Sequence, residues 1–242
     1  MIDCQELTFS QFNQFCQNLP SIKKSVPCRN FKIMYDEIQH IISGKSEIRF
    51  GAAIQAVASY LARSQTTGPV AQEYKRFKAE ETKRLIGYIE ETNLWVGSIN
   101  AENYVSEGAE QKVYIKNEKS VLKLNDGIYY PSWIDYLHNL LLHNYFFSDT
   151  AYQLLGFYFS ENVLYAVVEQ AFVKATENTN LGLVKIFMES NGFQNTKNND
   201  YYNPTLGIIL EDLHDENVIT KKGILYFIDT VFYIKTRNLN LL

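Results

Sequence analysis

The stretch Asp212-Leu213-His214-Asp215-Glu216-Asn217 decides how this chain is interpreted, together with Asp229 at the end of the apolar run Ile224-Leu225-Tyr226-Phe227-Ile228. Asn217 follows Asp212 by five positions, and Asp229 follows Asn217 by twelve. The apolar run between polar residues predicts a strand. Asp and Asn are also frequent in loops because they favour turns, so the interpretation needs support from the rest of the chain.

The residue types at these three positions suit phosphoryl transfer. That reaction needs a carboxylate to accept the proton of the attacking hydroxyl, and oxygen ligands for the magnesium ions that bridge the phosphates. Asp212 fits the first role, and Asn217 and Asp229 fit the second. Their order and spacing match the catalytic loop and the metal-binding Asp of protein kinases.

The residues upstream supply candidates for nucleotide binding. Residues 106–115 predict a strand, a turn that includes Gly108 and Ala109, and a second strand. Such a turn lets backbone N–H groups approach phosphates closely. A further strand is predicted over 120–124, in which apolar residues flank Lys123. A half-buried lysine is costly unless its ammonium meets an anion. The alternative is a lysine that snorkels from an edge strand, and the polar set downstream favours the phosphate.

The segments between these motifs predict alternating helices and strands. A helix is expected over 131–147 with Ser132 as its N-cap, then strands over 152–159 and 163–168, and a helix over 181–190 stopped by Asn191-Gly192. Residues 205–210 lead into the loop at Asp212. The segment 169–172 is interpreted as a hinge between two lobes, where the backbone groups of Glu169 and Ala171 would bind the adenine edge.

Residues 104–234 resemble the kinase domain found in polyvalent proteins of phages and mobile elements. The matching stretches, in order, are EGAEQKVY, VLKLN, LLLHN, YQLLGF, LYAVVEQ, DLHDENV and YFID. The resemblance implies transfer of phosphate from ATP, with magnesium, to a protein hydroxyl. It implies nucleotide binding by Gly108 and Lys123, the base role for Asp212, and metal binding by Asn217 and Asp229.

Some positions depart from the usual protein-kinase pattern. Leu210 stands where many protein kinases have a His, and His214 replaces the Lys two residues after the catalytic Asp. We expect His214 to contact phosphate or substrate. A D-L-H-x-x-N loop is also similar to that of aminoglycoside and choline phosphotransferases. Asp135 is a candidate partner for Lys123, because no Glu occurs between Lys123 and Glu161. The alternative for Asp135 is an exposed first-turn acid favoured by the helix dipole.

The first hundred residues predict helices over 10–19, 31–43, 51–64 and 71–92. The last of these mixes Lys78 and other basic residues with Glu81 and other acids, which is typical of a solvated helix face with i,i+4 pairs. Residues 1–100 hold 12 Lys and Arg against 10 Asp and Glu. That net charge of +2 is too small to indicate nucleic-acid binding. Leu94-Trp95-Val96 is expected to anchor the helices on the sheet, with Trp95 buried.

Composition agrees with a folded enzyme. Hydrophobic residues make up 46% of the 242 residues, enough for a core. No apolar run reaches the length of a membrane span, and the N-terminus lacks the features of a signal peptide, which predicts a cytoplasmic protein. Cys4, Cys16 and Cys28 are odd in number and lack metal-ligand spacing, so we expect free thiols.

These observations predict an α+β protein: a helical region over 1–100, followed over 101–242 by a compact, two-lobed, protein-kinase-like domain with a reduced C-terminal lobe. The predicted function is ATP- and magnesium-dependent phosphotransfer to a serine, threonine or tyrosine hydroxyl. One alternative is a small-molecule phosphotransferase, which His214 and the small C-terminal lobe favour. Another is a pseudokinase that binds nucleotide or a protein without turnover, which the departures at Leu210 and in the helix favour. The acceptor is an unidentified protein or small molecule.

Overall fold

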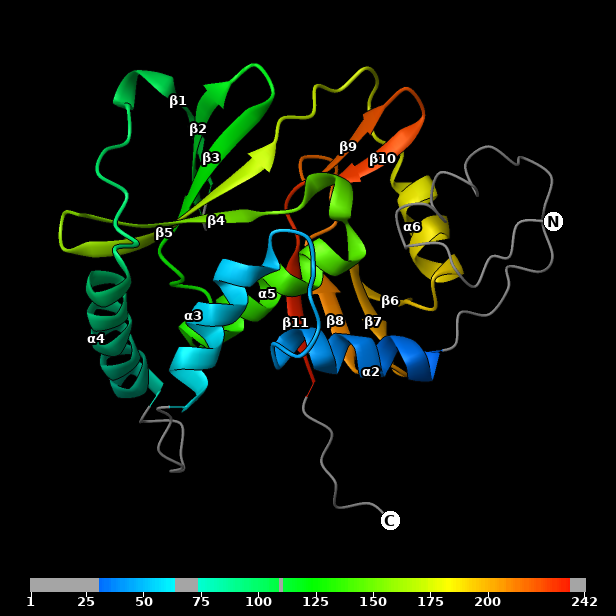
Figure 1. Ribbon diagram of the computed structural model, residues 1–242. Helices are drawn as coiled ribbons and strands as arrows, with labels where there is room; N and C mark the ends of the chain where they lie inside the picture. Colours follow the sequence, from blue (N-terminus) through cyan, green and yellow to red (C-terminus); the bar gives the residue numbers. More distant parts are fainter. Residues whose placement is uncertain (1–30, 64–73, 109–110, 236–242) are drawn as a thin grey trace, which may run out of the picture. The chain divides into compact units, whose positions relative to one another are not determined.

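The computed structural model describes residues 31–63, 74–108 and 111–235 (Figure 1). The chain divides into two compact units that alternate along the sequence. The first, the five-stranded unit, comprises Ile41–Asn144 and Ala151–Phe172. The second, the loop unit, comprises Met1–His40, Tyr145–Thr150 and Val173–Leu242. Each unit has its own sheet, and helices accompany antiparallel strands in both, as expected of an α+β protein.

The five-stranded unit is built on an antiparallel sheet with the strand order β1-β2-β3-β5-β4 (Figure 1). Its central strands are the most apolar, because strands with neighbours on both sides bury more of their surface. In β5, Leu164, Ala166, Val167 and Val168 are all buried. The strands are β1 (Tyr104–Glu107), β2 (Gln111–Asn117), β3 (Ser120–Asn125), β4 (Gln153–Ser160) and β5 (Val163–Ala171).

Three helices belong wholly or mainly to this unit: α3 (Gly51–Arg63), α4 (Tyr74–Thr92) and α5 (Trp133–Phe146), with a short 3-10 turn η2 (Ala101–Asn103) before β1. Apolar residues at helical spacing explain their packing, since Ile54, Val57 and Leu61 of α3 are fully buried. The predicted cap of α5 is confirmed, because the Asp135 N–H donates to Ser132 Oγ at 3.0 Å.

The segment after α4 joins the helices to the sheet through its backbone. The Val96 N–H donates to the Phe157 oxygen at 2.7 Å, and the Phe157 N–H donates to the Leu94 oxygen at 2.8 Å. The expected anchor is therefore confirmed. The expected burial of Trp95 is wrong, because its side chain is 36% exposed. Main-chain hydrogen bonds to β4 fix this segment, so the anchor does not depend on burial of the Trp95 ring.

The mixed-charge face predicted for α4 is not uniformly solvated. Glu81 is only 2% exposed and accepts the Trp133 N–H at 2.7 Å. Lys78 donates to the main-chain oxygens of Gly127 and Tyr130. Both side chains thus satisfy backbone groups at the start of α5 and in the turn before it, which charge pattern alone does not indicate.

The loop unit contains two small sheets, with the orders β11-β8-β7-β6 and β10-β9. Its elements are most of α2 (Phe31–Ile42), η3 (Ser148–Thr150), α6 (Leu181–Ser190), β6 (Gln194–Lys197), β7 (Asp200–Asn203), β8 (Ile208–Glu211), β9 (Val218–Lys221), β10 (Ile224–Phe227) and β11 (Val231–Ile234). Its core is aromatic: Phe147 stacks on Phe227 with ring centroids 4.1 Å apart, and Phe146 stacks on Phe232 at 5.4 Å.

Most predicted elements are confirmed within one to three residues, and α6 has the predicted bounds. The predicted helix over 10–19 and the three cysteines lie outside the described residues. Strands β6, β7, β8, β9 and β11 were not predicted. None of the helices in the described part of the chain is both long enough and apolar enough to cross a membrane.

Candidate functional site

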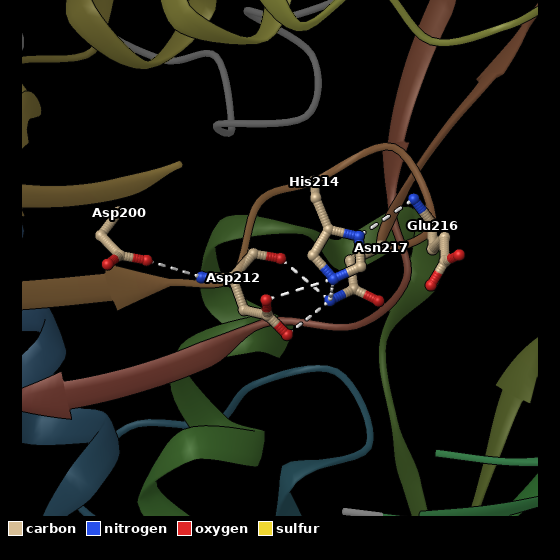
Figure 2. Close-up of polar contacts among 5 residues, drawn as sticks. All are labelled: Asp200, Asp212, His214, Glu216 and Asn217. Atoms are coloured by element: carbon tan, nitrogen blue, oxygen red, sulfur yellow. Dashed lines mark hydrogen bonds and ion pairs between the residues drawn. The ribbon is translucent and has the colours of Figure 1, made fainter. Parts of the chain in front are cut away.

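The Asp212 loop connects β8 to β9 within the loop unit. Leu213 is fully buried and anchors the loop, and its N–H donates to the Asn199 oxygen at 3.2 Å. Asp212 has a φ of +70°, in the left-handed region that Asp and Asn tolerate better than most other residues. Its N–H donates to Asp200 Oδ1 at 3.1 Å (Figure 2). The burial of Leu213 and this bond hold the Asp212 side chain in an exposed, fixed place.

Asn217 ties the two ends of the loop together (Figure 2). Its Nδ2 donates to the Asp212 main-chain oxygen at 2.9 Å and to Asp212 Oδ2 at 2.8 Å. Both acceptors are oxygens, so the amide orientation is chemically determined. The amide oxygen Oδ1 therefore points away from Asp212 and is the atom that suits a cation.

The hydrogen bonds of His214 determine its tautomer. Its Nδ1 accepts the Glu216 N–H at 3.2 Å, so in the neutral ring the proton is on Nε2. Nε2 lies 3.2 Å from Asp212 Oδ1 and can donate to it. Asp212 thus meets one donor on each carboxylate oxygen, Nε2 of His214 and Nδ2 of Asn217. This pair of donors orients the carboxylate.

Asp229 is fixed next to Asn217 by the backbone. The N–H groups of Ile228 and Asp229 both approach the Asn217 oxygen, at 2.9 Å and 3.4 Å. The half-buried residue Asp229 thus lies two positions after β10, with its backbone beside the Asn217 peptide. The four predicted residues Asp212, His214, Asn217 and Asp229 are therefore brought together in one unit.

The charge of this region is negative. Burial is the largest cause that raises the pKa of Glu211 above its ordinary range, and the charges of Asp200 and Asp212 raise it further. A region with this charge attracts cations. Within the described residues no cluster of three or more His, Cys, Asp or Glu side chains is suited to a metal ion. Asn217 and Asp229 still fit magnesium, which binds through one or two protein oxygens together with substrate phosphates.

Lys123 lies in the five-stranded unit, on the third strand of its sheet. Lys123 is only 4% exposed, and β3 is a central strand with β2 and β5 on its two sides. The alternative of an edge-strand lysine is therefore wrong. Its ammonium lies over the Tyr152 ring, 5.4 Å from the centroid.

Gly108 directly follows β1, and its N–H donates to the Gln111 oxygen at 3.0 Å. A Cβ added there would meet no atom of the described residues within 4 Å, so their packing does not require glycine. Ala109 lies outside the described residues.

The predicted hinge lies at the end of β5. The Phe172 N–H donates to the Lys119 oxygen at 2.8 Å, so the backbone groups of Ala171 face away from β3 by strand alternation. Strand β4 begins at Gln153, opposite Glu169, so Ala171 lies beyond it. The Glu169 carboxylate meets Lys116 Nζ at 2.6 Å. Burial favours a higher pKa for Glu169, but the hydrogen bond and the positive charge of Lys116 outweigh it and lower the pKa.

Several site features were not predicted. Asp200 holds the Asp212 N–H, Tyr152 contacts Lys123, and Glu81 caps α5. Asp135, the candidate partner of Lys123, accepts a hydrogen bond from the Ser132 hydroxyl at 2.6 Å. It therefore lies in the first turn of α5, as its alternative interpretation states, but it is half-buried and not exposed as that interpretation expected. The contacts of Asp200, Tyr152 and Glu81 join residues that are distant in sequence, and neither helical spacing nor strand alternation predicts such contacts.

A family model described as the serine/threonine/tyrosine kinase found in polyvalent proteins matches residues 78–236. The match covers more than half of the chain and includes Gly108, Lys123, Asp212, Asn217 and Asp229. Neither a curated protein nor a solved structure matches the chain. The chain belongs to this kinase family.

Proposed function

We propose that this member of the polyvalent-protein kinase family is an ATP- and magnesium-dependent kinase that phosphorylates a protein hydroxyl. The observation that supports the proposal most is the double hydrogen bond from Asn217 to Asp212. It orients a carboxylate for proton acceptance and leaves an amide oxygen for a cation, and the backbone of Asp229 lies beside the same residue. Kinase catalysis requires these features of its catalytic loop.

In this proposal the five-stranded unit binds the nucleotide and the loop unit performs the transfer. Gly108 and Ala109 approach the phosphates, Lys123 neutralises them, and Glu169 and Ala171 hold the adenine edge through backbone groups. One of the points at which the chain passes from one unit to the other falls after Phe172, at the proposed hinge. Residues 101–242 form the two-lobed kinase-like domain with its small C-terminal lobe, and the helices of residues 1–100 support it.

The residues divide the reaction between them. Asp212 accepts the proton of the attacking hydroxyl as its oxygen bonds to the γ-phosphorus, and the bond to the bridging oxygen breaks to release ADP. Asn217 and Asp229 would hold magnesium, which neutralises phosphate charge when bound. His214, with its proton on Nε2, orients Asp212 and faces the incoming phosphate or acceptor.

A small-molecule phosphotransferase is the second candidate. Directly after Asp229, Thr230 is buried and residues 231–234 form β11, paired with β8. The residues after the metal-binding Asp thus form a sheet strand, where many protein kinases have an activation segment. This observation favours an acceptor that needs no such segment. A pseudokinase is the third candidate, and a measurement of phosphate transfer distinguishes it from the two enzymes.

We also propose that the protein is located in the cytoplasm.

The experiment measures binding and transfer separately in the full chain. ATP with magnesium should raise the melting temperature, and radiolabelled ATP should give labelled protein. Asp212→Asn should keep the thermal shift and lose about 10²–10⁴-fold in transfer rate, the usual contribution of a general base. Asp215→Asn, an exposed acid in the same loop, is the matched control and should keep both.

Asp229→Asn and Lys123→Met should weaken the magnesium-dependent thermal shift. A wild-type chain that ignores ATP and magnesium would exclude the proposed function. A chain that binds ATP but transfers no phosphate to protein, small molecule or water would be a pseudokinase.

A further inference from the structure

Lys123 and Tyr152 belong to different strands but meet on one face of the five-stranded sheet. Lys123 of β3 and Leu154 of β4 both lie opposite Val168 of the intervening strand β5. Directly opposed residues of an antiparallel sheet point to the same face, so Lys123 and Leu154 share a face. Tyr152 lies two positions before Leu154 and is placed on the same side. This register explains why the Lys123 ammonium lies over the Tyr152 ring.

The Tyr152 ring is held by α5 at two points. Asn144 brackets the Tyr152 peptide: its Oδ1 accepts the Tyr152 N–H at 2.7 Å, and its Nδ2 donates to the Tyr152 oxygen at 2.8 Å. The neighbouring His143 packs against the ring, with centroids 4.4 Å apart. Tyr152, His143 and Asn144 are all at least 97% buried. The ring therefore has one fixed orientation toward β3.

We infer that Tyr152 is a positioning residue, which holds the ammonium of Lys123 in place for a nucleotide phosphate. This inference rests on the proposed function, because it assigns Tyr152 to the phosphate contact of Lys123. The distance of 5.4 Å is within the range of a cation–π contact. Burial strengthens the contact, since Lys123 and Tyr152 are 4% and 3% exposed.

A neutral phenol attracts the ammonium through the face of its ring, so the contact itself adds no charge beside Lys123. Helix α5 then acts on Lys123 through Asn144, His143 and the ring between them. Changes in the position of α5 would move the ammonium by way of Tyr152.

The test compares variants that keep or remove the ring face. Tyr152→Phe keeps the face and should bind ATP with magnesium within about twofold of the wild type. Tyr152→Leu keeps apolar bulk without the face and should raise the Kd about tenfold, the scale of a lost buried cation–π contact. Phe157→Leu is the matched control, because Phe157 is a fully buried aromatic of β4 that packs on Trp133. It should lower the melting temperature and leave the Kd unchanged.

A double-variant cycle links the effect to Lys123. In a Lys123→Met background, Tyr152→Leu should change the Kd no further. Side-chain NMR of labelled lysine adds a readout without nucleotide: the Lys123 methylene signals should show a ring-current shift in the wild type and in Tyr152→Phe, and lose it in Tyr152→Leu.

The outcomes separate the two proposals. A wild-type chain that does not bind ATP contradicts the proposed function and the inference together. A wild-type chain that binds ATP, with a Tyr152→Leu variant that binds equally well or loses no more than Phe157→Leu does, overturns the inference alone.

Discussion

The side-chain amide of Asn217 donates to both the main-chain oxygen and the carboxylate of Asp212, at 2.9 Å and 2.8 Å. The two residues stand at opposite ends of the loop, so one side chain closes the loop and orients the carboxylate. The proposed cation site and the proposed base would thereby be coupled, because the amide nitrogen binds Asp212 and the amide oxygen of the same side chain would bind a cation.

Replacing Asn217 by Asp should break this coupling. A carboxylate oxygen of the new Asp side chain would take the place of Nδ2, next to the main-chain oxygen and Oδ2 of Asp212. We expect a loss of about 1 kcal/mol at neutral pH, because the Asp212 side chain is 55% exposed and solvent screens the repulsion. The deficit should shrink as the ionic strength rises, because salt screens the repulsion between exposed charges. Thermal unfolding at several salt concentrations measures it, and a deficit independent of salt would contradict the explanation.

Gly108→Ala should leave stability unchanged and weaken nucleotide binding. Among the described residues a Cβ at Gly108 meets no atom within 4 Å, so packing there tolerates the substitution. A phosphate held close to the backbone would clash with the added Cβ. Gly97→Ala is the matched control, because a Cβ at Gly97 likewise meets no atom of the described part of the chain within 4 Å. Titration of both variants with ATP and magnesium decides the point, and equal affinity in Gly108→Ala and Gly97→Ala would remove Gly108 from the phosphate site.

Glu81 should make folding stability depend on pH. Burial is the main reason its pKa lies above the ordinary value of 4.5; hydrogen bonds from the backbone of Trp133 and Ile134 act in the opposite direction. Its Oε1 is buried and has no hydrogen-bond partner within the described structure. Between the unfolded and folded pKa values the folded state binds more protons, so stability from this group falls as the pH rises.

Glu81→Gln should therefore flatten the decline of the melting temperature as the pH rises from about 4.5 toward the folded pKa of Glu81. Gln still offers an oxygen to the Trp133 N–H. Glu90→Gln, an exposed acid of the same helix, should keep the wild-type slope. Identical pH profiles for wild type and Glu81→Gln would show that Glu81 has no part in the decline.

The sequence was sufficient to predict what local pattern determines. Apolar spacing located α3, α5 and α6, and the order of Asp212, Asn217 and Asp229 located the loop. Strand β6 was missed because it is polar and exposed throughout, so it has no hydrophobic alternation. Strand β7 was missed because it is short and buries a polar Asn203.

The missed contacts are those that tertiary structure creates. Glu81 was interpreted as part of a solvated face, yet it lies against the N-terminus of α5, 52 residues further along the chain. Tyr152 reaches Lys123 only through the register of three strands. Neither relationship follows from a pattern within one helix or strand.

The dependence of the sheet on the preceding helices leads to the last prediction. A fragment of residues 101–242 lacks α4, and with it the fully buried Leu85 and Ile89 and the Glu81 carboxylate that caps α5. It also lacks the Leu94–Val96 segment that pairs with Phe157. The buried ring of Trp133, whose Nε1 donates to Thr82 at 3.0 Å, would lose this contact.

We therefore expect the fragment 101–242 to be poorly soluble or to unfold without a cooperative transition, because losing even one large buried side chain costs about 3–5 kcal/mol. A fragment of residues 31–242 is the matched control, since it keeps every helix that the structure describes. Thermal unfolding of both fragments beside the full chain measures the difference. A soluble 101–242 fragment with a cooperative transition at the temperature of the full chain would show that α3 and α4 form an independent module, and their role in supporting the sheet would have to be abandoned.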